Sequence, residues 1–272
     1  MSDRMIVKRD APIGVFDSGV GGLTVILELF RQMPHESFIY YADTAHVPYG
    51  PRDPQELRMF ASSISEFLIN KGCKMVIIAC NTSTSLALEE LAARFSPPFV
   101  GVIEPGVDKA LEITKNQKVG VIATIATINS GAYQNMLQRK KHVIEVSAAP
   151  CPLFVPFVEK GQTEGEEVYK TAVTYLEPLK NKGIDSLILG CTHYPFLLPV
   201  IIKVLGPSIA VIDPARETVS RAKEKLKELS LFKDTGKPSY QYYASADPEA
   251  FRRIGSMFLG EDIGEVKGIN LE

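Results

Sequence analysis

Lys71-Gly72-Cys-Lys-Met-Val-Ile-Ile-Ala-Cys80-Asn81-Thr82 is an apolar run that follows a Lys-Gly pair and ends in a cysteine and two polar residues. The pattern returns at Lys182-Gly183-Ile-Asp-Ser-Leu-Ile-Leu-Gly-Cys191-Thr192-His193, with the same spacing between the Lys-Gly pair and the cysteine. An apolar run of this kind, followed by a helical pattern, is typical of a buried parallel strand. The sequence therefore predicts one strand-and-thiol unit built twice.

Cys80 and Cys191 are predicted to lie at the carboxyl ends of these strands. In open α/β sheets this end faces the ligand crevice, and the amides at the N-terminus of the next helix favour a thiolate. We therefore expect the helix to lower the pKa of each thiol and make a base available. A single cysteine of this kind is more often an ordinary buried residue. Two in matching contexts favour a functional interpretation.

Strand and helix patterns alternate along the rest of the chain. The predicted strands are 13–16, 38–41, 75–79, 99–103, 119–124, 143–146, 209–213 and 240–244, besides the run before Cys191, and the predicted helices are 23–33, 54–70, 83–95, 215–229 and 248–258. This alternation predicts an α/β fold with mainly parallel sheets flanked by helices.

An internal duplication is also indicated. Val119-Gly-Val-Ile-Ala-Thr124 resembles Ile13-Gly-Val-Phe-Asp-Ser18, and Cys191 follows Cys80 at a similar offset. We expect two similar lobes related by a pseudo-twofold axis, with the active site in the cleft between them. The predicted division assigns 1–101 together with 212–272 to the first α/β lobe and 102–211 to the second.

Composition limits the classes of function. The 272 residues include 30 Lys+Arg and 32 Asp+Glu, and the net charge of -2 argues against a nucleic-acid or membrane partner. Residues 1–10 do not resemble a signal peptide, and we expect a cytoplasmic protein. The four cysteines are sparse enough for free thiols. No CxxC or HExxH pattern is present, so no metal site is expected.

Polar turns follow the predicted strands. Asp17-Ser18-Gly19-Val20-Gly21-Gly22 offers exposed amides that suit a phosphate or a carboxylate. Asp17 is a candidate to hold a substrate ammonium or to position a thiol, or else it caps a turn. Asn81-Thr82 and Thr192-His193 are candidates for ligand binding, and helix capping explains them equally well. His193 differs because it exchanges a proton near neutrality.

Two thiols on opposite lobes favour proton transfer at a carbon held between them. One thiolate removes a proton from one face and the other thiol delivers a proton to the opposite face, so the product is the mirror image. A Cα–H beside a carboxylate is a very weak acid, so donors must stabilise the developing enediolate. A hydrolase with one cysteine and one histidine leaves the second thiol unexplained.

Several segments resemble the bacterial glutamate racemases, which are cofactor-independent members of the aspartate/glutamate racemase group. The segments are Ile13-Gly-Val-Phe-Asp-Ser-Gly-Val-Gly-Gly22, Tyr41-Ala-Asp-Thr-Ala-His-Val-Pro-Tyr-Gly50, Ala79-Cys-Asn-Thr82, Gly101-Val-Ile-Glu-Pro-Gly106, Cys151-Pro-Leu-Phe-Val-Pro-Phe-Val-Glu159 and Leu189-Gly-Cys-Thr-His-Tyr-Pro195. They cover nearly the whole chain in one order. The resemblance implies interconversion of L- and D-glutamate without pyridoxal phosphate or metal, to supply D-glutamate for peptidoglycan.

The resemblance also implies roles for individual residues. Cys80 is matched to the acid/base that acts on D-glutamate and Cys191 to the one that acts on L-glutamate. The residues matched to the assistants of the thiols are Asp17, Glu159 and His193, and those matched to substrate binding are Asp17, Ser18, Tyr49, Gly50, Asn81, Thr82, Thr124, Thr192 and His193. Cys73 and Cys151 match no catalytic position, and a homodimer is expected.

One turn departs from the family pattern. Ala123-Thr124-Ile125-Ala126-Thr127 has alanines at Ala123 and Ala126, where the family commonly has glycines. The added methyl groups are expected to restrict the turn or the access of substrate. The alternatives left open are a racemase for aspartate or another amino acid, a non-catalytic two-lobed binding protein, and a hydrolase that uses one cysteine.

Overall fold

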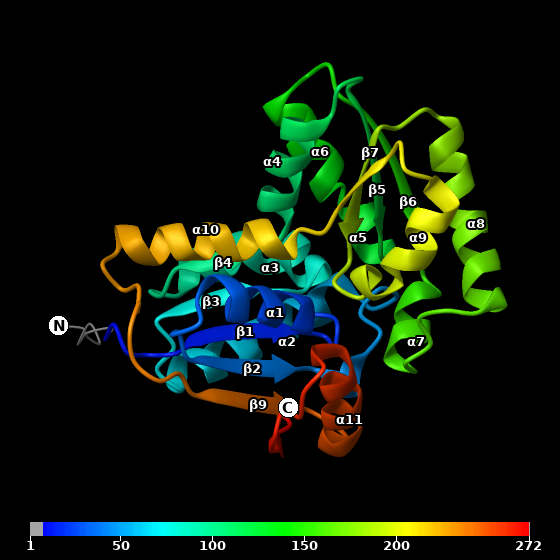
Figure 1. Cartoon of the computed structure of the whole chain (residues 1–272). Helices are drawn as coiled ribbons and strands as arrows, with labels where there is room; N and C mark the ends of the chain where they lie inside the picture. The colour runs from blue at the N-terminus through cyan, green and yellow to red at the C-terminus, as the bar shows by residue number, and fades with distance from the viewer. Residues whose placement is uncertain (1–7, 272) are drawn as a thin grey trace.

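The first strands of the chain form one of two parallel sheets. The computed structural model describes residues 8–271, so the prediction for residues 1–10 lies mostly outside them. Figure 1 shows two α/β lobes, one built on each sheet. The prediction of an α/β fold with parallel sheets and two lobes is confirmed.

The first lobe contains a six-stranded sheet in the order β10-β9-β2-β1-β3-β4, with every pair parallel. Its strands are β1 (Ile13–Asp17), β2 (Phe38–Ala42), β3 (Met75–Ile78), β4 (Phe99–Gly101), β9 (Tyr240–Ala244) and β10 (Val266–Gly268). β9 pairs with β2, so a late segment of the chain extends a sheet that the early strands begin.

The second lobe contains a four-stranded parallel sheet in the order β6-β5-β7-β8. Its strands are β5 (Lys118–Ala123), β6 (Glu145–Pro150), β7 (Ser186–Gly190) and β8 (Ala210–Ile212). Counted along each lobe, the second, first, third and fourth strands are neighbours in both sheets. The boundaries at 101/102 and 211/212 remain a prediction.

Helices cover the faces of both sheets. They are α1 (Leu23–Gln32), α2 (Pro54–Asn70), α3 (Asn81–Arg94), α4 (Ile103–Ile113), α5 (Ile125–Ser130), α6 (Ala132–Lys140), α7 (Phe154–Glu159), α8 (Glu166–Asn181), α9 (Leu198–Leu205), α10 (Ala215–Glu228) and α11 (Pro248–Leu259), with 3-10 turns η1 (Thr44–His46) and η2 (Tyr194–Leu197). Over residues 8–271, no helix combines the length and apolar character that a membrane crossing needs.

The burial of the strands explains why their apolar patterns predicted them. Every residue of β1, β3 and β7 is buried, because helices lie on both faces of each sheet. The predicted strand 99–103 ends at Gly101, since Ile103 begins α4. The predicted strand 143–146 begins at Glu145, and Val143 is exposed. The helix predicted from residue 83 begins at Asn81, and β10 was not predicted.

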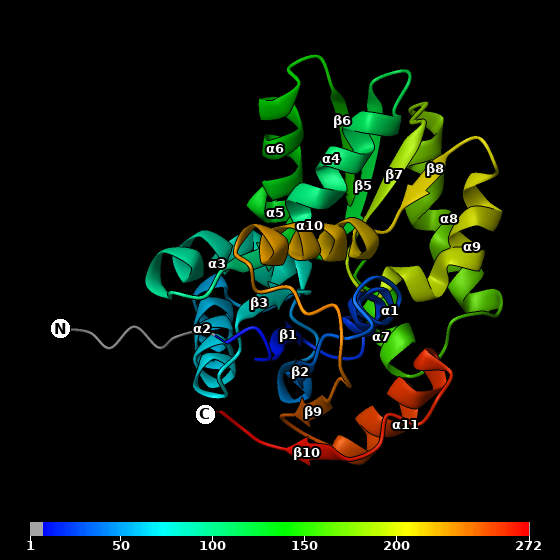
Figure 2. The same cartoon turned by 60° about the vertical axis from the view of Figure 1, so that its left-hand side comes forward.

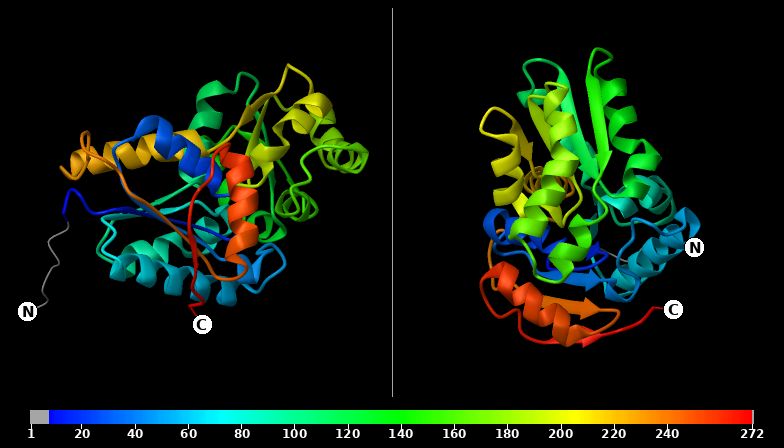
Figure 3. Two further views of the ribbon diagram at one scale, coloured as in Figure 1. Left: turned by 60° about the horizontal axis from the view of Figure 1, so that its bottom comes forward. Right: turned by 90° about the vertical axis from the view of Figure 1, so that its right-hand side faces the viewer.

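The two lobes pack directly on each other. α10 contacts α1 and β4 of the first lobe and α4 of the second, and Figure 2 shows it lying between the two sheets. The largest apolar cluster includes residues of both lobes, among them Val20 and Tyr194. Phe258 of α11 stacks on Phe196 of η2 with ring centroids 3.9 Å apart. Figure 3 shows α11 at the side of the six-stranded lobe.

Candidate active site

Polar side chains follow the carboxyl ends of the central strands, and those of one lobe meet those of the other. Asp17 ends β1 and Thr192 follows β7, and the Thr192 hydroxyl donates to Asp17 Oδ2 at 2.8 Å. Thr82 follows β3 and Thr124 follows β5, and their hydroxyl oxygens lie 2.9 Å apart. The end of the first strand of each lobe therefore meets the end of the third strand of the other lobe at one interface.

Cys80 lies between β3 and α3 and is the N-cap residue of that helix. Its Sγ accepts from the Ser83 N–H at 3.5 Å, and the residue is 5% exposed. Burial and the nearby Asp17 carboxylate raise the pKa of the thiol to about 12, although the Ser83 amide lowers it. The amide effect is present, but the loss of hydration outweighs it, so the predicted net fall of the Cys80 pKa is wrong.

Cys191 has different neighbours at the equivalent place in the second lobe. Its Sγ lies 3.7 Å from His193 Nδ1, and His193 Nε2 lies 2.5 Å from Glu159 Oε1. Burial alone would lower the pKa of His193, but the hydrogen bonds to Cys191 and Glu159 raise it well above its usual value. His193 is therefore held as a cation beside the Cys191 thiol.

Glu159 also contacts the first lobe. Its Oε1 accepts from the Val20 N–H at 3.2 Å, and the side chain is 20% exposed. The sequence alone gave no reason to place this glutamate at the site, because His193 and Val20 are distant from it in the chain. The carboxylate links the histidine of one lobe to the glycine-rich turn of the other.

Asp17 is fully buried at the end of β1. Burial raises the pKa of its carboxyl group, although His193 and the hydrogen bonds from Thr192, Gly19 and Ser18 lower it. The Ser18 hydroxyl and the Gly19 N–H both donate to Oδ1 at 3.2 Å. Asp17 is thus a dehydrated carboxylate that a cationic group would stabilise.

Two glycines allow the lobes to approach this closely. A Cβ at Gly19 would collide with the Glu159 carboxylate, and one at Gly21 would lie 2.5 Å from His193 Nδ1. No real Cβ contact is that short, so any side chain would push His193 or Glu159 away. The Gly19 and Val20 amides of the turn donate to the protein's own Asp17 and Glu159 carboxylates, and the binding of a ligand's phosphate or carboxylate there stays a prediction.

A second polar cluster also joins the two lobes. The hydroxyls of Thr82, Thr124 and Thr127 lie 2.9 to 3.1 Å from one another. The Tyr133 hydroxyl donates to Asn81 Oδ1 at 2.6 Å. Neither Tyr133 nor its helix α6 was predicted, and a lone tyrosine in the sequence does not reveal whether it lies in the core or reaches the site.

Comparisons with known proteins agree on one family. The family model described as Asp/Glu/hydantoin racemase matches residues 16–222. The chain is 44% identical to the glutamate racemase of Corynebacterium glutamicum over 270 residues, which is 98% of both chains. The chain belongs to this racemase family. It is therefore an enzyme of the isomerase class.

Solved structures of racemases have the same fold. The glutamate racemase of Bacillus anthracis superposes with a TM-score of 0.93 at 36% identity, and the match covers 97% of this chain and 98% of that one. The glutamate racemase of Francisella tularensis, solved in complex with D-glutamate, superposes with a TM-score of 0.91 at 38% identity, covering 97% and 99% of the two chains.

Tyr49 and Gly50 of this racemase lie at the lobe interface as well. Tyr49 is buried in an apolar cluster with Leu57 and Cys80, and Ala126 of the second lobe packs against that cluster. The Gly50 carbonyl accepts from the Ala126 N–H at 3.2 Å. The methyl of Ala126, one of the two departures from the family pattern, thus lies where the lobes meet.

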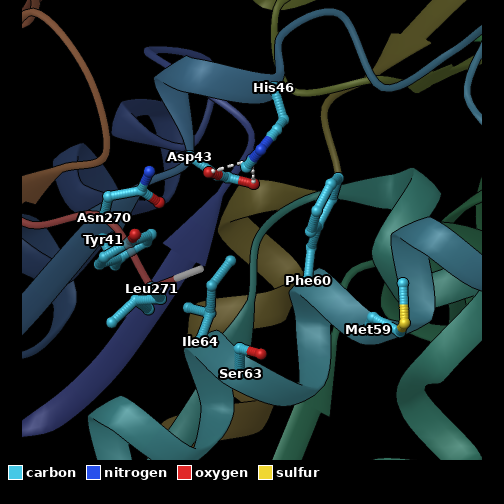
Figure 4. A pocket seen from close by; sticks show the side chains of 9 residues that line it. All are labelled: Tyr41, Asp43, His46, Met59, Phe60, Ser63, Ile64, Asn270 and Leu271. Atoms are coloured by element: carbon cyan, nitrogen blue, oxygen red, sulfur yellow. Dashed lines mark hydrogen bonds and ion pairs between the residues drawn. The ribbon is translucent and has the colours of Figure 1, made fainter.

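The Tyr49 hydroxyl donates to Asp43 Oδ2 at 2.5 Å. Asp43 was not predicted, although it follows β2 directly and lies in the segment 41–50 that carries part of the resemblance. A cavity of about 270 Å³ lies beside it, lined by Tyr41, Asp43, His46, Met59, Phe60, Ser63, Ile64, Asn270 and Leu271. Figure 4 shows Asp43 and His46 side by side at this cavity.

The other two cysteines and Ala123 lie in the interior of the protein. Cys73 and Cys151 are buried free thiols, and neither has a hydrogen bond to Cys80 or Cys191. Within residues 8–271, no three histidine, cysteine or acidic side chains are arranged to hold a metal ion. Ala123, the other departure from the family pattern, is fully buried at the end of β5.

Proposed function

We propose that this racemase interconverts L- and D-glutamate by a two-base mechanism in which Cys80 and Cys191 are the acid/bases. The observation that carries the proposal is the symmetric arrangement of the two cysteines, each following a central strand at the interface between the lobes. The choice of glutamate as substrate rests on the similarity to glutamate racemases, which extends over 98% to 99% of their length.

The proton balance is simple. In the direction from L-glutamate, the Cys191 thiolate takes the α-proton, and the Cys80 thiol delivers its own proton to the opposite face of the carbon. The two thiols exchange protonation states in one turnover, so the next turnover in the same direction requires proton exchange with solvent or with neighbouring groups. In the direction from D-glutamate, Cys80 is the base and Cys191 the acid.

His193 and Glu159 assist the second-lobe thiol. In the proposal the imidazole 3.7 Å from Cys191 Sγ orients this thiol, and the hydrogen bond to Glu159 orients the imidazole and helps to raise its pKa. In the proposal this pair assists Cys191 when it removes the α-proton of the substrate.

Asp17 and a bound substrate assist the first-lobe thiol. Without a ligand, burial and the Asp17 carboxylate raise the pKa of Cys80. An α-ammonium next to Asp17 would neutralise that carboxylate and add positive charge near the sulfur, and both effects favour the thiolate. Substrate binding and activation of Cys80 are therefore coupled in the proposal.

The carboxylates of the substrate require donors that also stabilise the enediolate. The hydroxyls of Ser18, Thr82, Thr124 and Thr192, the Asn81 side chain and the backbone of Tyr49 and Gly50 are the proposed set. They come from both lobes, so the complete set exists only when the lobes are in contact.

The family resemblance also supports a proposal for the cellular role, location and partners of the enzyme. D-Glutamate is supplied for peptidoglycan by a cytoplasmic homodimer that uses no cofactor and has no nucleic-acid or membrane partner. Sedimentation of the purified protein tests the dimer, and a single species of 29.9 kDa would reject it.

Proton NMR of L-glutamate in D2O tests the reaction. We expect the α-proton signal to disappear while chiral chromatography follows the approach to a racemic mixture. Cys80→Ser and Cys191→Ser should each lose racemisation by at least about a hundredfold, which is the scale of general acid/base catalysis. Cys73→Ser, at a buried thiol outside the site, is the matched control. Exchange with aspartate and not with glutamate would contradict the choice of substrate.

A further inference from the structure

The segment 41–50 contains polar residues to which neither the family match nor the proposed mechanism assigns a role. Asp43 follows β2 directly and is 3% exposed. Its backbone N–H donates to the Asp17 carbonyl at 2.9 Å. Asp43 is therefore a buried acid fixed to the strand end that carries a proposed substrate ligand.

The Asp43 carboxylate joins two side chains of the same segment. The Tyr49 hydroxyl donates to Oδ2 at 2.5 Å, and His46 Nδ1 lies 2.8 and 2.9 Å from the two oxygens. The His46 ring stacks on Phe60 of α2, with centroids 3.9 Å apart and planes inclined by 16°. Figure 4 shows His46 between Asp43 and Phe60, so the imidazole is held on both sides.

The turn between Asp43 and His46 is anchored to another part of the sheet. The Thr44 hydroxyl donates to the Ala246 carbonyl at 2.5 Å and accepts from the Ala246 N–H at 2.9 Å. The Ala45 N–H donates to Ser245 Oγ at 2.8 Å. Because this turn is attached to the residues after β9, Asp43 is a rigid acceptor for Tyr49.

Tyr49 transmits this fixed position to the thiol and to the second lobe. Its ring belongs to the cluster that contains Cys80, and the carbonyl of the next residue, Gly50, accepts from the Ala126 N–H. The buried Tyr49 hydroxyl has a pKa well above its usual value, through burial first and then the Asp43 charge, so it remains a donor. The bond to Asp43 is the polar contact that orients the ring.

We propose that Asp43 is a positioning residue of the racemase site, and that His46 orients it. Through the Tyr49 hydroxyl, Asp43 holds the aromatic ring against Cys80 and the Tyr49-Gly50 turn against the second lobe. This inference rests on the proposed function, because Asp43 would support substrate binding and the position of the Tyr49 ring against Cys80.

Steady-state kinetics with glutamate in both directions test the proposal. Asp43→Ala and Tyr49→Phe should each lower kcat/KM about tenfold, chiefly by raising KM, since a hydrogen bond to a buried charge is worth that factor or more. The double variant should lose no more than the worse single variant, because both changes remove one bond. Asp43→Asn retains an acceptor oxygen for Tyr49 and should recover most of the lost KM.

Asp185→Ala is the matched control, because Asp185 is also a carboxylate that closes a turn beside a strand. It accepts from the Thr114 hydroxyl at 2.7 Å and from two backbone amides, at the opposite end of β7 from Cys191. We expect this control to lower Tm with an unchanged KM. If Asp43→Ala does not fold, Tyr49→Phe, Asp43→Asn and their double variant complete the same comparison.

Three outcomes would overturn the inference. They are additive losses in the double variant, a wild-type KM in Asp43→Ala and Tyr49→Phe, and an equal rise of KM in Asp185→Ala. With an active wild-type enzyme, any of these rejects the role of Asp43 and leaves the two-cysteine mechanism standing. A wild-type protein that exchanges no α-proton of glutamate rejects the proposed function, and the inference with it.

Discussion

Cys80 and Cys191 occupy equivalent places in the two lobes, but their neighbours differ in charge. Cys80 has the Asp17 carboxylate nearby and accepts a hydrogen bond from the Ser83 amide, whereas Cys191 lies beside His193, whose pKa is raised well above its usual value. The first-lobe thiol is therefore unfavourable as a thiolate until a cation binds, while the second has its counter-ion built in. The two lobes therefore share a topology but differ in the charged groups that lie beside their thiols.

The titration of Cys80 is the first prediction at this scale. The folded pKa is raised to about 12 from 9.0, so the protonated form persists until the pH rises through that range. The ultraviolet absorbance of thiolate should show no contribution from Cys80 between about pH 7 and pH 10. The measurement is the difference between wild-type protein and Cys80→Ser without ligand. A Cys80 thiolate at neutral pH would show that the helix amides dominate over burial.

The sequence predicted these residues better than their acidities. Side chains that follow buried strands collect at one edge of a sheet, so Cys80, Cys191 and Asp17 were recognisable from local pattern. The pKa of a thiol depends on how much water the rest of the chain removes, and no local pattern contains that quantity. Glu159 needed the family resemblance, because its partners are brought to it only by the fold.

At the scale of elements, α5 is the part of the second lobe that touches the first-lobe thiol cluster. Thr124 is its N-cap residue and accepts from the Thr127 N–H at 3.3 Å. Two residues further on, Ala126 packs on the cluster of Tyr49, Leu57 and Cys80. The Ala126 methyl group, which a glycine lacks, thus contributes to the contact between the lobes, and the restriction of the turn or of substrate access by the two alanines stays a prediction.

Ala126→Gly should weaken the contact between the lobes. The change removes one partly buried methyl group, which is worth at most about 0.8 kcal/mol, and places glycine in a helix, which costs about 1 kcal/mol relative to alanine. We expect a lower Tm and a KM raised about threefold, because the lobes separate more easily. Ala132→Gly, at a partly buried alanine at the start of α6, is the control for helix propensity alone. A KM equal to that of the wild type would assign no role to the methyl group.

The alternation of strands and helices was predictable because the central strands β1, β3 and β7 are buried along their whole length, whereas the helices α4 to α9 had no predicted ranges. The predicted strand bounds were wrong at Val143 and at Ile103. Val143 is an exposed apolar residue before β6, and Ile103 is the first residue of α4. The short edge strand β10 was missed because Val266–Gly268 contains a single apolar side chain and two exposed residues. Edge strands with so little burial have almost no pattern to read.

At the scale of the whole molecule, the two thiols are closed off by the contact between the lobes. Cys80 and Cys191 are each 5% exposed, and hydrogen bonds join Asp17 to Thr192, Thr82 to Thr124, and Asn81 to Tyr133. We predict that a substrate must separate these pairs before it reaches both thiols. The sequence indicated two lobes and a cleft, but the extent of closure depends on side-chain contacts that only the folded chain reveals.

A covalent link between the lobes tests whether they must separate. A Cβ at Gly50 would lie 3.2 Å from the Cβ of Thr124, close to the separation of disulfide-bonded residues, which is roughly 3.5 to 4.5 Å. The double variant Gly50→Cys/Thr124→Cys should therefore form a disulfide across the interface after small adjustments. In the oxidised form, iodoacetamide should modify Cys80 and Cys191 at least about tenfold more slowly than in the single variants, because modification requires local opening. Mass spectrometry of the two peptides provides the rates, and reduction should restore them. Equal rates in the linked and unlinked proteins would mean that small molecules reach the thiols without separation of the lobes, and substrate entry would then require only side-chain motion.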